Sequence, residues 1–148
     1  MTAINKVLVA NRGEIACRIF RTLDRMGIPG VAIHHPADAR SPALGMASAT
    51  VEIDGPTPVA SYLDVQGIVD ACRQTGADAI HPGFGFLAEN AGFARRLSEE
   101  GITFIGPSPE AIELMGNKVA ARSFCAAHGF PLAPSVAEAD RDGDFLER

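Results

Sequence analysis

The chain has 148 residues, of which 47% are hydrophobic and 21% charged, so it can build the core of one α/β domain. Its formal net charge of −5 disfavours nucleic acid as a partner, because phosphate binding requires a basic face. No apolar run approaches the ~18 residues that span a bilayer, and the N-terminus lacks the apolar segment of a signal peptide. We therefore expect a cytoplasmic protein with no membrane partner.

The first 34 residues predict a strand, a helix and a second strand. The apolar run Lys6–Ala10 ends at polar residues and a glycine, which is typical of a buried parallel strand. A helix is predicted from Gly13 to Met26, where apolar residues recur every three or four positions, and it ends at Gly27. The next strand is predicted from Gly30 to His34. This order is a βαβ unit.

The alternation of strands and helices continues along the chain. Further strands are predicted at residues 50–53, 78–81 and 103–105, and further helices at 65–76, 93–101, 109–115 and 119–128. Turn-rich connections are expected at residues 34–42 and 55–58, and residues 145–148 resemble the start of a helix in a chain that continues. The pattern predicts an α/β fold with a doubly wound parallel sheet.

Ligands of such sheets bind beyond the carboxyl ends of the strands, and two glycine-bearing turns fall there. In the first turn, Gly13 stands alone at a helix entrance, without the glycine fingerprint of dinucleotide-binding proteins or a Walker A loop. The second strand ends in His34-His35 rather than in an acidic residue, so NAD binding is disfavoured. A purely structural turn, oriented by Arg12 and Glu14, remains an open interpretation.

The second turn, HPGFGFLAEN, leaves a strand and enters a helix. It contains two glycines, which permit close backbone approach, and two aromatic residues, Phe84 and Phe86. Such a loop favours a functional role. Glu89 and Asn90 have the alternative role of capping the following helix, and His81 is interpreted as a hydrogen-bonding residue that orients the loop.

Lys118 follows a glycine break between two helices, so its ammonium group either reaches a phosphate or is a solvated surface charge. The four histidines have no metal-like spacing, and no metal site is predicted. Cys17, Cys72 and Cys125 are widely spaced, which argues against a zinc site or a disulfide framework. We expect all three to be buried thiols in a reducing compartment.

Several segments together resemble the first domain of biotin carboxylases, the components that serve acetyl-CoA, propionyl-CoA and other acyl-CoA carboxylases, pyruvate carboxylase and urea carboxylase. They are KVLVANRGEIACRI, SYLDVQGIVDAC, AIHPGFGFLAENAGFA, FIGPSPEAIELMGNK and HGFPLAPS. The resemblance covers residues 6–134. It implies a Rossmann-like domain over residues 1–117 that precedes an ATP-grasp body, and the truncated start of that body over residues 118–148.

The resemblance also implies a ligase activity. In this family ATP phosphorylates bicarbonate to carboxyphosphate, which releases CO₂ for capture by N1 of biotin on a carrier domain. The implied partners are the biotin carboxyl carrier domain, a carboxyltransferase component, the rest of the ATP-grasp body and further subunits of an oligomer. The catalytic residues and the ligands of Mg²⁺ or Mn²⁺ are expected outside this fragment, which is expected to be inactive alone and to associate through an apolar docking face.

Four residues are assigned roles by the resemblance alone. Lys118 matches the family lysine that contacts ATP, and Phe84, Gly85 and Glu89 belong to the loop that faces the biotin substrate. The sequence departs from the family where Phe84 replaces a tyrosine and Asn117 replaces an aspartate. We expect the two glycine-bearing turns and Lys118 to line one cleft.

Two other functions remain open from the sequence. The chain is alternatively a domain of another ATP-grasp ligase, such as one similar to carbamoyl-phosphate synthase. It is also consistent with a non-catalytic scaffold that has lost the grasp body.

Overall fold

The computed structural model describes residues 3–133, so the helix start predicted at 145–148 lies outside the described residues. One sheet contains five strands, all paired in parallel, in the order β3-β2-β1-β4-β5. The strands are β1 (Val7–Val9), β2 (Gly30–His34), β3 (Ala49–Glu52), β4 (Ala79–His81) and β5 (Thr103–Phe104). The predicted doubly wound α/β fold is confirmed, with β1 and β4 on either side of the point where the strand order reverses.

The helices are α1 (Gly13–Met26), α2 (Pro58–Tyr62), α3 (Val65–Thr75), α4 (Ala91–Glu99), α5 (Pro109–Gly116) and α6 (Lys118–Ala127). Two short 3₁₀ turns, η1 (Pro36–Asp38) and η2 (Leu44–Met46), lie between β2 and β3. Helix α2 was not predicted. It begins where the Thr57 hydroxyl accepts a hydrogen bond from the Ala60 N–H, with Pro58 in the first helical position.

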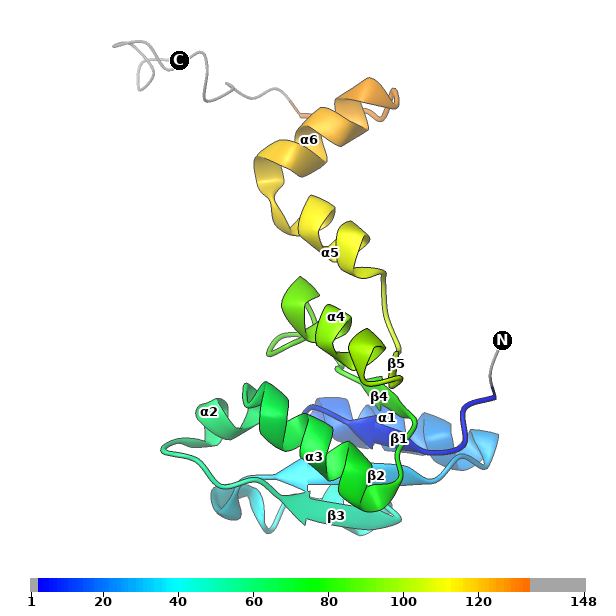
Figure 1. Ribbon diagram of the computed structural model, residues 1–148, viewed down its shortest axis with the longest axis vertical. Coiled ribbons are helices and arrows are strands. Elements are labelled where there is room, and N and C mark those ends of the chain that lie inside the picture. Colours follow the sequence, from blue (N-terminus) through cyan, green and yellow to red (C-terminus); the bar gives the residue numbers. More distant parts are fainter. Residues whose placement is uncertain (1–2, 134–148) are drawn as a thin grey trace.

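The side chains of β1 alternate between two apolar cores on opposite faces of the sheet. Val7 and Val9 pack with the buried face of α1, whereas Leu8 and Ala10 pack with buried residues of α3 and α4. Figure 1 shows α1 behind the sheet and α3 in front of it. Burial on both faces explains why β1 and β2 are continuous apolar runs, whereas the edge strand β3 is partly exposed and alternates between apolar and polar residues.

One apolar groove remains open on the α1 side of the sheet. It has a volume of about 560 Å³, and α1 is the only helix that contributes to its lining. Its apolar lining residues are Ile4, Val7, Ile15, Ile19, Leu23, Met26, Ile28, Phe84 and Ile105. We call this surface the α1 groove.

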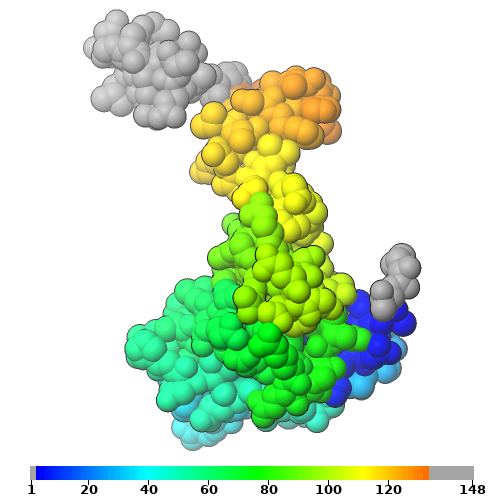
Figure 2. Space-filling view, viewed as in Figure 1, coloured from blue at the N-terminus to red at the C-terminus, as the bar shows by residue number. Residues whose placement is uncertain are grey.

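Helices α5 and α6 rise one after the other away from the sheet, as a narrow extension of the body (Figures 1 and 2). Within the described residues α5 buries only Ile112, and α6 buries no residue. The prediction of buried cysteines is therefore confirmed for Cys17 and Cys72 but wrong for Cys125, which is half-buried on α6. All three are free thiols. Across residues 3–133, none of the helices has the length and apolar character needed to cross a membrane.

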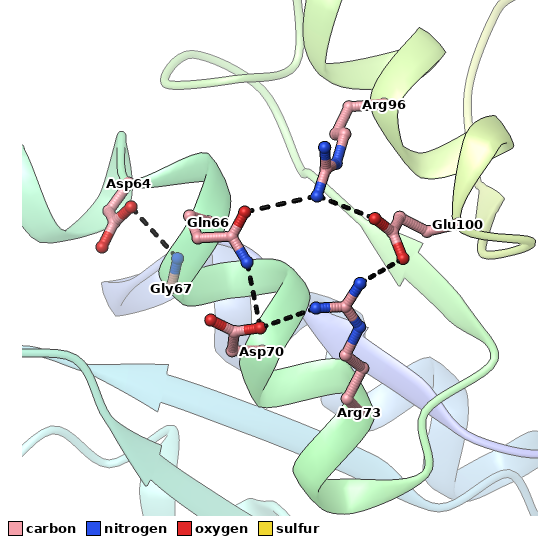
Figure 3. Close-up of polar contacts among 7 residues, drawn as sticks. All are labelled: Asp64, Gln66, Gly67, Asp70, Arg73, Arg96 and Glu100. Atoms are coloured by element: carbon pink, nitrogen blue, oxygen red, sulfur yellow. Dashed lines mark hydrogen bonds and ion pairs between the residues drawn. The ribbon is translucent and has the colours of Figure 1, made fainter.

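A set of charged and polar side chains joins α3 to the end of α4 (Figure 3). The Glu100 carboxylate accepts a hydrogen bond from Arg73 and forms an ion pair with Arg96 at 2.7 Å, and Arg73 also donates to Asp70 at 2.9 Å. Gln66 donates to Asp70 at 3.0 Å and accepts from Arg96 at 3.3 Å. We call these five residues the α3–α4 polar network. It holds together two helices that cover the same face of the sheet.

Candidate functional site

The two glycine-bearing turns lie side by side at the carboxyl edge of the sheet, because β1 and β4 are neighbours. Asn11, which is 2% exposed, connects them. Its side-chain N–H₂ donates hydrogen bonds to the carbonyls of Pro82 at 2.8 Å and Phe84 at 2.9 Å. The first turn therefore anchors the beginning of the loop at residues 82–90.

The backbone of this loop has three residues with positive φ. Gly83 has φ +67°, and a Cβ there would lie 2.6 Å from the Asn11 Nδ2 and 2.8 Å from the Ile15 Cγ2, so only glycine fits. Gly85 has φ +69° in open space. Phe86 has φ +41° and is the only non-glycine residue with positive φ among residues 3–133. Such strain costs about 1–3 kcal/mol and persists only where surrounding contacts enforce it.

His81 ends β4 directly before the loop. Its Nδ1 accepts a hydrogen bond from the Gly83 N–H at 3.0 Å, and burial lowers its pKa. The neutral ring therefore orients the start of the loop, in agreement with the role expected from the sequence.

A cleft of about 760 Å³ separates the loop from the last two helices. We call it the α4–α6 cleft. Its lining residues are Phe86, Glu89, Asn90, Ala91, Ile112, Glu113, Gly116, Asn117, Lys118 and Val119. Glu89 and Lys118 are both exposed, and neither forms an ion pair within residues 3–133. Glu113 also lines the cleft, but its carboxylate is paired with Arg95 at 2.5 Å. The cleft thus presents one carboxylate without an ion pair, Glu89, and one ammonium group, Lys118, to an incoming ligand.

Lys118 is the first residue of α6. The Asn117 side-chain oxygen caps this helix by accepting hydrogen bonds from the N–H groups of Val119 at 3.0 Å and Ala120 at 3.1 Å. The ammonium group and the positive end of the helix dipole therefore act at the same place, which favours an anion. On the opposite side of the cleft, the Asn90 side-chain oxygen accepts a hydrogen bond from the Phe93 N–H and caps α4. Asn90 therefore has the helix-capping role that was one of the alternatives from the sequence.

The structure brings some predicted site residues together and separates others. Glu89 and Lys118 share the α4–α6 cleft. Phe84 is 67% exposed and lines the α1 groove instead, on the other side of Gly85. We expected the two glycine-bearing turns and Lys118 to line one cleft. This expectation is wrong for the first turn, which supports the loop but does not line the α4–α6 cleft. The physical reason is that Asn11 reaches the loop backbone from the sheet side.

Sequence reasoning missed a cluster around Asp38. The Asp38 carboxylate accepts hydrogen bonds from Arg12 Nε at 2.9 Å, from Arg12 Nη2, and from the Tyr62 hydroxyl at 2.9 Å. The Arg12 hydrogen bond holds the pKa of Asp38 below its usual value, and burial together with Asp38 raises the pKa of Tyr62 to about 12. We call these three residues the Asp38 cluster. One available signal was Tyr62 itself, the only tyrosine in the chain.

Residues 3–133 contain no group of three or more His, Cys, Asp or Glu side chains that could hold a metal ion. The charged side chains of the α4–α6 cleft are Glu89, Lys118 and the Glu113 carboxylate that is paired with Arg95, and this set fits a charged organic or phosphate ligand better than a protein-held cation. No step of the chemistry is therefore assigned to a metal bound by these residues.

Comparison with known proteins identifies the family. The model of the biotin carboxylase N-terminal domain matches residues 3–112. The alpha subunit of mitochondrial methylcrotonoyl-CoA carboxylase from rice is 49% identical over 98% of this chain. A biotin carboxylase from Halalkalibacterium halodurans is 50% identical over 93% of it.

A solved structure has the same fold. The biotin carboxylase domain of Hydrogenobacter thermophilus 2-oxoglutarate carboxylase, in complex with MgADP, ADP and bicarbonate, superposes with a TM-score of 0.89, with 42% identity over 99% of this chain. The chain spans 32% of that structure, 31% of the Halalkalibacterium protein and 20% of the rice protein. By sequence and by fold, the chain belongs to the biotin carboxylase N-terminal domain family.

Proposed function

We propose that this chain supplies the first domain of a biotin carboxylase, a ligase that uses ATP and bicarbonate to carboxylate biotin on a carrier domain. The observation that carries the proposal is the α4–α6 cleft at the carboxyl edge of the sheet, where Glu89 and Lys118 lie together. Membership of the family and the nucleotide and bicarbonate in the Hydrogenobacter relative support it.

Lys118 is the proposed ATP contact. Its ammonium group is exposed, lines the cleft and lies at the amino end of α6, so a phosphate there gains a charge-assisted hydrogen bond. Asn117 keeps the helix cap that an aspartate would provide, but without a negative charge beside the lysine. The anion-attracting field at this point is therefore not reduced by its neighbour.

Phe84, Gly85 and Glu89 are the proposed substrate-facing residues. The exposed Phe84 ring offers a flat apolar surface, and Gly85 leaves the loop backbone open to close approach. Both features suit the fused ring of biotin, which has polar edges and apolar faces. Glu89, near the end of the same loop, lines the cleft together with Lys118.

The rest of the active site is proposed to come from an ATP-grasp body that begins at about residue 118 and holds Mg²⁺ or Mn²⁺. The part of the α1 groove away from Phe84 and the exposed side chains Met115, Val119 and Phe124 are apolar surfaces suited to docking on it. The assembled enzyme also requires a carrier domain and a carboxyltransferase, and it is proposed to be oligomeric. Three free thiols support a reducing, cytoplasmic location.

A chimera tests the proposed function. This chain replaces the matching segment of the Halalkalibacterium biotin carboxylase, which is 50% identical to it. The expected result is ATP cleavage that depends on both bicarbonate and biotin. Lys118→Ala in the chimera is expected to raise the KM for ATP by about 5- to 150-fold, the equivalent of a lost contact of about 1–3 kcal/mol. An unchanged KM would identify Lys118 as a surface charge.

The same assay separates the alternatives. ATP cleavage that requires bicarbonate but ignores biotin indicates another type of ATP-grasp ligase. A chimera that folds, as judged by circular dichroism and a cooperative melt, but cleaves no ATP indicates a scaffold. Either result contradicts the proposed function.

A further inference from the structure

The Asp38 cluster reaches the 82–90 loop through an aromatic contact. The Tyr62 ring, which is 1% exposed, stacks on the Phe86 ring with centroids 5.2 Å apart and planes inclined by 26°. The Arg12 guanidinium group lies 5.8 Å from the centroid of the same tyrosine ring. Tyr62 is thus fixed twice, at its hydroxyl by Asp38 and at its ring by neighbouring groups.

Phe86 is the position of the loop that most needs external support. Its φ of +41° is unfavourable for a bulky residue and persists only where neighbours enforce it. The Phe86 side chain is also part of the α4–α6 cleft, together with Glu89. One side chain therefore contacts the Asp38 cluster and forms a wall of the candidate site.

Other contacts hold the loop on either side of Phe86. Asn11 binds the carbonyls of Pro82 and Phe84, which precede Phe86. After Phe86, the Ala88 N–H donates to the Gly85 carbonyl within the loop itself. Leu87, which is 3% exposed, packs in the apolar core that contains Tyr62, and Phe86 packs against the same core. The stacking contact with Tyr62 therefore holds the strained residue itself, between the Asn11 anchor and a buried neighbour.

We propose that the Asp38 cluster is a brace: Arg12 and Asp38 fix the Tyr62 hydroxyl, and Tyr62 holds Phe86 so that the 82–90 loop keeps its cleft-forming conformation. Tyr62 is a positioning residue, because it lines neither the α4–α6 cleft nor the α1 groove. The consequence for ATP binding rests on the proposed function, whereas the effect on the loop does not.

Removing a single hydroxyl distinguishes a brace from ordinary core packing. Tyr62→Phe keeps the buried ring and its stacking surface and removes only the hydrogen bond to Asp38. Ser61→Ala is the matched control, since Ser61 is buried on the same helix and its hydroxyl has no hydrogen-bond partner within residues 3–133. If Tyr62 only fills space in the core, the two variants are expected to show the same rate of amide hydrogen exchange in the 82–90 loop.

The measurement is residue-resolved amide hydrogen exchange on this chain. Tyr62→Phe is expected to speed exchange of the Ala88 and Asn90 amides by about 3- to 10-fold relative to amides of α1, which is the effect of losing one modest hydrogen bond. Ser61→Ala is expected to leave that ratio unchanged. Equal loop exchange in the two variants overturns the proposal.

A second variant guards against loss of folding. Asp38→Asn retains Tyr62 but removes the charge that binds Arg12, so it is expected to speed loop exchange in the same direction. Tyr62→Phe and Asp38→Asn act through one unit, so their effects on loop exchange are expected to be less than additive. Additive effects contradict a shared brace.

Enzyme kinetics test the consequence for the ligand. In the chimera, Tyr62→Phe is expected to raise the KM for ATP by about 3- to 10-fold while kcat stays within about twofold. Faster loop exchange with an unchanged KM refutes the link to the nucleotide. If the chimera without the Tyr62 substitution is inactive, the proposed function is refuted. The hydrogen-exchange measurement then still tests whether the Asp38 cluster holds the loop.

Discussion

Asn11→Ala tests the connection between the two turns. The substitution removes a buried hydrogen bond to the Pro82 carbonyl and a partly buried hydrogen bond to the Phe84 carbonyl. Leaving a buried acceptor unpaired costs about 1–3 kcal/mol, and a partly buried bond contributes about 1 kcal/mol. The expected loss in the free energy of unfolding is therefore about 2–4 kcal/mol, with a decrease in Tm of about 5–15 °C.

Urea denaturation followed by far-ultraviolet circular dichroism measures this loss. Asn11→Asp has nearly the same shape but cannot donate when ionised, so it is expected to destabilise the chain at least as much as alanine. Asn5→Ala is the matched control, because the Asn5 amide donates to Asp78 at an exposed site and its loss is expected to cost under about 1 kcal/mol. A loss below about 1 kcal/mol for Asn11→Ala would refute the argument.

Three further predictions concern the loop, the helices and the tyrosine. Gly83→Ala combines a positive φ with a contact of 2.6 Å and is expected to cost about 2–4 kcal/mol, more than Gly85→Ala, where the space is open; thermal melts in the reverse order would contradict this. Glu100→Gln weakens two exposed ion pairs of the α3–α4 polar network and is expected to cost under about 1 kcal/mol at low salt, so a loss above about 2 kcal/mol in urea denaturation would contradict it. The pKa of Tyr62 is raised from 10.0 to about 12 because burial and the Asp38 carboxylate favour the neutral phenol. The stabilisation of the folded state by the neutral Tyr62 phenol is therefore complete below pH ~10 and is lost as the pH rises through about 12. Because Tyr62 is the only tyrosine, its ultraviolet absorbance reports the titration directly, and ionisation near pH 10 in the folded protein would contradict the predicted contact.

The layout of the fold was predictable because its signals are local. Helix α1 has the predicted bounds, since a regular apolar stripe and a terminal glycine mark them. Helix α2 was missed because five residues are too few for a periodic pattern, although Thr57-Pro58 carries a capping signal. Cys125 was misjudged because its helix has an apolar side but packs against little else within residues 3–133.

The candidate site was only partly predictable, because its geometry depends on contacts between distant segments. Phe84 and Glu89 lie five positions apart, but the positive φ angles between them turn their side chains to different surfaces. The contact of Arg12 and Tyr62 with Asp38 joins segments 24 to 26 residues apart and leaves no periodic trace in the sequence. The meeting of Glu89 and Lys118 likewise depends on the placement of α5 and α6.

The extension formed by α5 and α6 has a consequence for how this domain tolerates change. Within residues 3–133, Lys118 lies on a helix that buries no residue, whereas the loop opposite is tied to the end of β1 through Asn11 and to an apolar core through Tyr62. Substitutions on the lysine side are therefore expected to disturb the folding of this domain less than substitutions on the loop side. Sequence differences among related domains, and mutations selected by directed evolution of this one, should accordingly concentrate on α5 and α6.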